Sequence, residues 1–202
     1  SKKINFSIRD FGVPNNSVDE LFVEVLKNDL VRSGWFRFDN KRPQFLLTGS
    51  LIRKQELRVE IHALQNSTKK SVFSRAFESA SDAHRALAHR VADAIIEAIL
   101  GHPGMSSAKV AVVGNRTGYK ELYICDIDGF NLKQVTSDKS IVVAPSWLPN
   151  KKSVLYTSYK GGYPNIYQTG RSKSLSNHGG LNTSACVSPN GKYMALILSK
   201  DG

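Results

Sequence analysis

Two segments of the sequence combine basic side chains with tyrosine. They read GNRTGYKE over residues 114–121 and SYKGGYPN over residues 158–165. Tyr and Arg bury a large area while keeping a polar end, so they are favoured where proteins contact one another. A histidine in the segment SNHGG adds a further polar group. The candidate partner-binding residues are Arg116, Tyr119, Lys120, Lys160, Tyr163 and His178.

A different role for the same residues stays open. Tyr119 and Tyr163 occupy equivalent places in the two segments, so they can instead pack inside the fold as structural residues of a repeat. His178 can simply be solvated in a loop between strands.

Metal chemistry finds little support in the spacing of its usual ligands. His84 and His89 are five residues apart on a predicted helix, which points them to different faces. The segment DIDGFN, residues 126–131, has glycine at its fourth position, whereas an EF-hand calcium loop needs it at the sixth. We therefore predict a hairpin turn here, no metal site and no cofactor.

Catalytic motifs are also missing from the sequence. No GxSxG nucleophile elbow occurs, and no glycine-rich phosphate loop. These observations predict no catalytic residues and a protein that is not an enzyme.

The composition is that of a soluble globular chain with a basic surface. The 202 residues carry a net charge of +11, and 41% of them are hydrophobic. No run approaches the roughly 18 apolar residues of a membrane span. The charge favours an anionic partner, but no nucleic-acid-binding motif accompanies it, so nucleic acid is not predicted as a partner.

The two cysteines do not form a CxxC pair. Cys125 and Cys186 both lie in or beside apolar, strand-like runs, so each is predicted to be a buried free thiol. A disulfide between them stays open.

Residues 1–102 follow the pattern of a mixed α/β domain. Ile4, Phe6 and Ile8 alternate as on a half-buried strand. Apolar residues then recur at helical spacing between Ser17 and Gly34. Three strands and a second helix follow, at residues 44–54, 56–65, 70–79 and 81–100.

Residues 103–202 lose the helical pattern and repeat themselves. The segment PSWLPNKKSVLYTSYKGG aligns with ACVSPNGKYMALILSKDG, which places Pro149 on Pro189 at a spacing of 40. A period of about 40–45 residues with four short strands, one of them KSLSN at 173–177, is typical of a β-propeller blade. Lys151 stands where the second copy has Gly191, which predicts a longer or strained turn.

The repeats and their flanks resemble a known family. SPNGKYMAL and ELYICDIDGFNLKQVTSD are similar to the repeat of the TolB family of the Tol–Pal cell-envelope system. LVRSGWFRF resembles the end of that family's first helix. AHRVADAIIEAILGHPGMSSAKVAVV resembles the join between its N-terminal domain and its first blade. The resemblance covers nearly the whole chain.

The resemblance implies an α+β, multidomain fold. An N-terminal α/β domain at 1–102 would precede the first two blades and the start of a third, at 103–202, of an incomplete six-bladed β-propeller. The sequence therefore reads as a piece of a longer chain. The passage between Phe38 and Phe45 is shorter than in the family.

The resemblance also implies a function. It is that of a non-catalytic periplasmic scaffold that binds the peptidoglycan-associated lipoprotein Pal and supports outer-membrane integrity, cell division and protein transport. The family contacts the inner-membrane protein TolA through an extreme N-terminal segment that is essentially missing here. The alternative is the propeller lid of a prolyl-oligopeptidase-like serine peptidase, whose hydrolase domain with its elbow this chain lacks.

Overall fold

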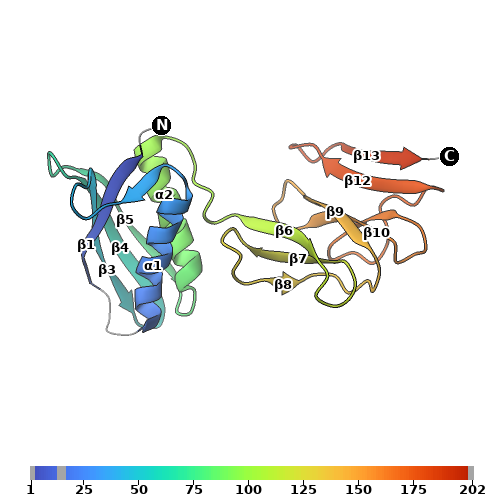
Figure 1. Cartoon of the computed structure of the whole chain (residues 1–202), viewed down its shortest axis with the longest axis horizontal. Helices are drawn as coiled ribbons and strands as arrows, with labels where there is room; N and C mark the ends of the chain where they lie inside the picture. The colour runs from blue at the N-terminus through green and yellow to red at the C-terminus, as the bar shows by residue number, and fades with distance from the viewer. Residues whose placement is uncertain (1–2, 13–16, 200–202) are drawn as a thin grey trace. The chain divides into compact units, whose positions relative to one another are not determined.

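The computed structural model describes residues 3–12 and 17–199, except for the side chains of residues 17–19. Over this range the protein is mostly β-sheet with two helices (Figure 1). The chain divides into two compact units, Ser1–Ala108 and Lys109–Gly202, which we call unit 1 and unit 2.

Unit 1 is built on one mixed sheet. Its strand order is β2-β1-β3-β4-β5, with β1 parallel to both β2 and β3 and the remaining neighbours antiparallel. The three consecutive strands predicted after the first helix are confirmed, whereas the three-residue β2 escaped prediction. The bounds are β1 Ile4–Gly12, β2 Phe36–Phe38, β3 Phe45–Arg53, β4 Glu56–Gln65 and β5 Ser71–Ala80.

Both helices of unit 1, α1 (Ser17–Arg32) and α2 (His84–Leu100), lie against one face of this sheet (Figure 1). The apolar stripe of α1 buries Phe22 and Leu26 completely, and alternate residues of β4 such as Leu57 meet the helices from the sheet side. The apolar residues that recur every 3.6 positions in the helices and every second position in the strands therefore pack into one core.

Neither helix, over the residues described, is both long and apolar enough to cross a bilayer.

The start of α2 differs from the prediction. The helix begins at His84 and not at Ser81, because Ala83 donates its N–H to the carbonyl of Ala80 at 3.0 Å and forms a turn first. Ala83, at the N-cap position, makes no capping hydrogen bond with its side chain. Gly101 ends the helix as predicted, with φ at 76° and its N–H on the carbonyl of Glu97 at 2.8 Å.

Unit 2 consists of short antiparallel sheets in chain order. The sheets have the orders β6-β7-β8, β11-β10-β9 and β12-β13. The predicted strand KSLSN reduces to a single bridge between Ser176 and Ile166. The bounds are β6 Lys109–Gly114, β7 Glu121–Asp126, β8 Lys133–Gln134, β9 Val142–Trp147, β10 Val154–Ser158, β11 Asn165–Gln168, β12 Leu181–Val187 and β13 Met194–Ser199.

Alternation along β10 joins the three sheets. Tyr156 and Val154 pack in a cluster with Leu122 of the first sheet. Leu155, which points to the opposite face, packs with Ala185 of the third sheet. Each sheet therefore covers a face of the next, as stacked repeats must.

The predicted strain in the turn between β9 and β10 is confirmed. Lys151 has φ at 56° and the equivalent Gly191 has φ at 73°, both in the left-handed region. Both close the turn with the same bond, from Lys151 N–H to Leu148 O at 2.9 Å and from Gly191 N–H to Ser188 O at 2.8 Å. The two turns have equal length, and the first places a lysine where glycine is favoured.

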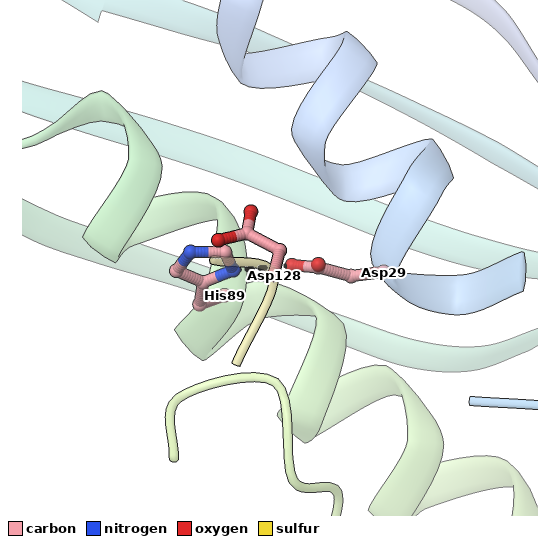
Figure 2. Close-up of side chains that lie close together, drawn as sticks. All are labelled: Asp29, His89 and Asp128. Atoms are coloured by element: carbon pink, nitrogen blue, oxygen red, sulfur yellow. Dashed lines mark hydrogen bonds and ion pairs between the residues drawn. The ribbon is translucent and has the colours of Figure 1, made fainter. Parts of the chain in front are cut away.

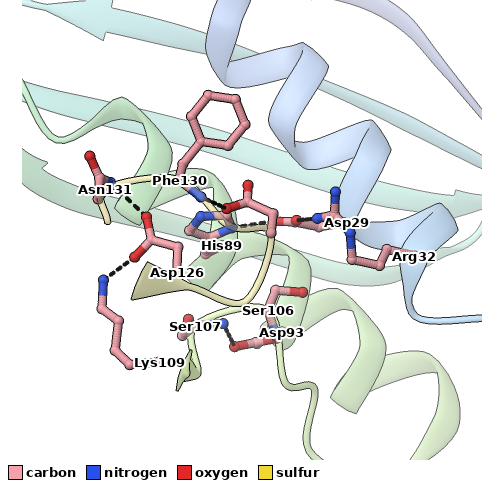
Figure 3. Close-up of polar contacts among 11 residues, drawn as sticks. Asp29, Arg32, His89, Asp93, Ser106, Ser107, Lys109, Asp126, Phe130 and Asn131 are labelled. Carbon is pink, nitrogen blue, oxygen red and sulfur yellow. Dashed lines mark hydrogen bonds and ion pairs between the residues drawn. The ribbon is translucent and has the colours of Figure 1, made fainter. Parts of the chain in front are cut away.

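The last residues of unit 1 are tied back to α2. The Asp93 carboxylate accepts the backbone N–H groups of Ser106 at 2.6 Å and Ser107 at 2.9 Å (Figure 3). Gly104 passes so close that an added Cβ would lie 2.6 Å from the Cα of Asp93.

This close approach yields a stability prediction. We expect Gly104→Ala to lower the free energy of unfolding by about 1–3 kcal/mol, because the new methyl group displaces backbone. Urea denaturation measures the change. Gly179→Ala is the matched control, since nothing lies within 4 Å of its added Cβ. Equal stability of the two variants would contradict the account.

Candidate functional site

The six predicted contact residues come together at one end of the sheets of unit 2. The segment 114–121 joins β6 to β7, and 158–165 joins β10 to β11. The segment 136–142 is held between them, since Val142 N–H donates to Lys120 O at 3.0 Å and Tyr159 N–H donates to Ile141 O at 3.1 Å. Together with residues 176–182 these segments form what we call the loop edge.

Most of the predicted contact residues are exposed there. Tyr119 is 48% exposed and Tyr163 is 70% exposed, so neither is packed between sheets. Arg116, Lys120 and His178 are exposed as well. The edge thus presents two phenol rings among cationic groups, which is the composition that protein contacts favour.

Lys160 differs from the other five because its charge is engaged inside unit 2. Its Nζ lies 3.2 Å from Asp138 Oδ1 and 4.0 Å from the centroid of the Tyr167 ring. The Tyr156 ring stacks on Tyr167 with centroids 5.8 Å apart. Lys160 therefore fixes the base of the 158–165 loop, and its amine is only partly available to a partner.

The same neighbours shift two pKa values. Burial, followed by the charge of Asp138, raises the pKa of Tyr156 above its usual value. Burial alone would lower the pKa of Lys160, but the hydrogen bond to Asp138 and the attraction of Tyr156 exceed that effect, so the pKa of Lys160 is raised.

A buried carboxylate supports the neighbouring segment of the loop edge. Glu121 is 1% exposed, and its two oxygens accept the Thr136 hydroxyl at 2.6 Å and the N–H of Lys139 at 2.8 Å. The N–H of Asp138 adds a third bond, at 3.1 Å. Charge-assisted hydrogen bonds of this kind fix the backbone of residues 136–139.

The position of His178 is fixed by an asparagine. Asn182, which is fully buried, donates from Nδ2 to the carbonyl of His178 at 2.7 Å and accepts its N–H at 3.2 Å. The backbone at His178 is thereby held in place while its ring stays exposed.

Unit 1 holds a buried polar pair that the sequence did not predict. His89 Nδ1 lies 2.5 Å from Asp29 Oδ2, and Figure 2 shows the two side chains facing each other from α2 and α1. Arg32 Nη1 lies 3.2 Å from the other oxygen of Asp29. In the sequence, this pair is indicated only by the positions of Asp29 and His89, two polar residues among the apolar residues of their helices.

The prediction for the cysteines is half wrong. Both are free and Cys125 is buried, but Cys186 is exposed. Cys186 lies on β12, whose alternation turns Ala185 into the core and its neighbour outward.

The raised pKa values make unit 2 sensitive to alkaline pH. Between about pH 9.5 and 11, the unfolded chain releases the Tyr156 and Lys160 protons before the folded chain does, so the free energy of unfolding falls as pH rises. We expect a shallower fall in Tyr156→Phe than in the unaltered protein. Urea unfolding at several pH values measures this, with the exposed Tyr163→Phe as control. Identical slopes in all three proteins would refute it.

The Glu121 bonds yield a second prediction. In Glu121→Gln the amide can accept at only one atom, so we expect a loss of about 1–3 kcal/mol in the free energy of unfolding. Hydrogen exchange of the amides at 136–142 should accelerate. Glu56→Gln, at an exposed position of unit 1, should change neither quantity. Unaltered exchange at 136–142 in Glu121→Gln would show that other contacts fix the segment.

Comparisons with known proteins agree with this architecture. A protein TolB homolog from Chlorobaculum tepidum is 33% identical over 135 residues, covering 65% of this chain and 30% of its own length. The Tol-Pal system protein TolB from Bordetella pertussis is 30% identical over 182 residues, covering 80% of this chain and 41% of its own length. The chain thus spans less than half the length of these curated relatives.

The fold has a counterpart among solved structures. The crystal structure of TolB from Acinetobacter baumannii matches 100% of this chain and 56% of its own chain with a TM-score of 0.83, at 23% sequence identity. The profile of the TolB β-propeller domain matches residues 96–202, which is more than half of the sequence. The chain belongs to the TolB β-propeller family.

Proposed function

We propose that this protein is a non-catalytic scaffold of the Tol–Pal system. It binds the peptidoglycan-associated lipoprotein in the periplasm and thereby supports outer-membrane integrity and cell division. The observation that carries the proposal is the loop edge of unit 2, where exposed tyrosines and cations converge. The names of the relatives, Tol-Pal system protein TolB among them, support the same role.

The proposal includes a finer description of the fold. Residues 1–102 form the N-terminal α/β domain, and residues 103–202 supply the first two blades and the start of a third blade of a six-bladed propeller. The stacking of three successive antiparallel sheets in unit 2 supports this assignment.

The loop edge suits recognition because its framework is held before a partner arrives. Glu121, Asp138 and Asn182 fix three of its four segments, 136–142, 158–165 and 176–182, through hydrogen bonds and an ion pair. A partner therefore has little backbone to order on binding, which reduces the entropic cost of association. Tyr119 and Tyr163 then supply apolar area with polar ends.

Calorimetric titration of the cognate Pal-like lipoprotein into the full-length parent protein tests the proposal. We expect the Tyr163→Ala and Tyr119→Ala variants each to weaken binding by about tenfold or more, as for central aromatic contacts. Arg116→Ala combined with Lys120→Ala should act in the same direction. Trp35→Ala removes a comparably exposed aromatic ring from unit 1 and serves as the control.

Two outcomes would count against the proposal. If the full-length parent protein does not bind the lipoprotein, the scaffold function fails. If it binds and the loop-edge variants bind equally well, the function stands and the assignment of the site to the loop edge fails. Circular dichroism of each variant separates loss of binding from loss of folding.

A further inference from the structure

The charge of unit 2 is distributed unevenly along the sequence. From residue 139 to residue 200 there are eight Lys and Arg and not one Asp or Glu. The chain as a whole has 17 acidic residues in 202, so a stretch of this length would hold about five of them at the average frequency. This segment therefore has cations without internal partners of opposite charge.

Five of these cations gather at the end of the sheets opposite the loop edge. The turn 148–153 joins β9 to β10, and Thr169 N–H donates to Val154 O at 2.9 Å, which places the residues after β11 beside that turn. The start of β12 lies at the loop edge, because Asn182 N–H donates to Pro164 O at 3.1 Å. The turn 188–193 after β12 consequently falls at the opposite end.

We call this end the basic edge. It consists of Lys151, Lys152, Arg171, Lys173 and Lys192, all of which are exposed.

The cations of the basic edge lack the ion pairs found elsewhere in unit 2. Lys160 pairs with Asp138, and Lys109 pairs with Asp126, which also accepts a bond from Asn131 at 2.6 Å (Figure 3). Within the part of the chain that the structure describes, no carboxylate lies within 4.0 Å of the five cations. The first sheet has two acidic residues at this end, Asp126 at the end of β7 and Asp128 in the turn that follows it.

Even the turn-forming residues of the basic edge are neutral. Asn150 Oδ1 accepts the N–H of Lys152 at 2.9 Å, and Asn190 Oδ1 accepts the N–H of Lys192 at 3.0 Å. Aspartate performs the same turn-forming role, yet both positions hold an amide. The turns thus fix the backbone at Lys152 and Lys192 without lowering the local positive potential.

We propose that the basic edge docks on an anionic phospholipid surface. Four of its five cations are lysines, which act as flexible point charges and need no bidentate partner. They come from separate turns at one end of stacked sheets, so they suit an extended array of phosphates more than a single pocket. The choice of lipid over nucleic acid rests on the periplasmic role proposed above.

Vesicle co-sedimentation of the 202-residue chain tests this inference. The vesicles contain 30% phosphatidylglycerol in phosphatidylcholine, or phosphatidylcholine alone. The variant K151Q/K152Q/R171Q/K173Q removes four charges from the basic edge. The control K41Q/K54Q/K69Q/K70Q removes four exposed charges from unit 1, so the two variants have the same net charge.

We expect the protein to bind the anionic vesicles and to bind less as salt increases. The basic-edge variant should bind at least about tenfold more weakly, since each lysine near such a surface contributes several-fold. The control should stay within about threefold of the unaltered protein. Circular dichroism should show the same fold in all three proteins.

Several results would overturn the inference. These are equal losses in both variants, equal binding to neutral vesicles, and no binding to anionic vesicles at low salt. The basic-edge variant could instead keep its binding to anionic vesicles and lose binding to a duplex oligonucleotide or to an acidic protein. That result would assign this edge to the other polyanion. The vesicles contain no lipoprotein, so this test and the titration of the loop edge can fail independently.

Discussion

The burial of carboxylates in unit 2 is the interaction on which both of its ends depend. Glu121 holds the segment 136–139 through backbone N–H groups, Asp138 holds Lys160, and Asp126 holds Lys109. Burying a carboxylate costs free energy unless hydrogen bonds and opposite charges satisfy it. Each of these three binds groups that order a loop or a strand end, although the second oxygen of Asp138, Oδ2, is buried without a hydrogen-bond partner among the described residues. Because these acidic side chains bind groups within unit 2, the charged side chains on its surface are mostly cations.

The stacking of sheets supplies the second constraint. A sheet of three short strands cannot bury both of its faces alone, and β10 shows how the neighbours solve this, with Tyr156 facing the first sheet and Leu155 facing the third. Stacking also brings the equivalent loops of successive sheets to the same end. The loop edge and the basic edge are therefore consequences of repetition, since each repeat adds its turns to the same two ends.

The sequence allowed much of this to be predicted, because repetition and periodicity are local signals. The alignment of 145–162 with 185–202 identified the equivalent turns, and alternation identified β3, β4 and β5. Other features depend on contacts that no local pattern encodes. The pairing of Lys160 with Asp138 joins residues 22 positions apart, and β2 forms only because β1 offers an edge to a three-residue segment. The exposure of Cys186 followed from the register of β12, which an apolar run alone does not define.

The two ends of unit 2 differ in how their cations are held, and this difference separates two kinds of recognition. At the loop edge, Lys160 is ordered by Asp138 and two aromatic rings, so its position is defined before any partner arrives. Defined positions favour one shape of partner over another. At the basic edge, the backbone turns are fixed by Asn150 and Asn190 while the lysine side chains have no carboxylate to hold them. Such side chains adapt to any array of negative charge and give attraction with little selectivity. A single repeat architecture thus presents a shaped surface at one end and a diffuse electrostatic surface at the other, and the placement of the acidic residues determines which is which.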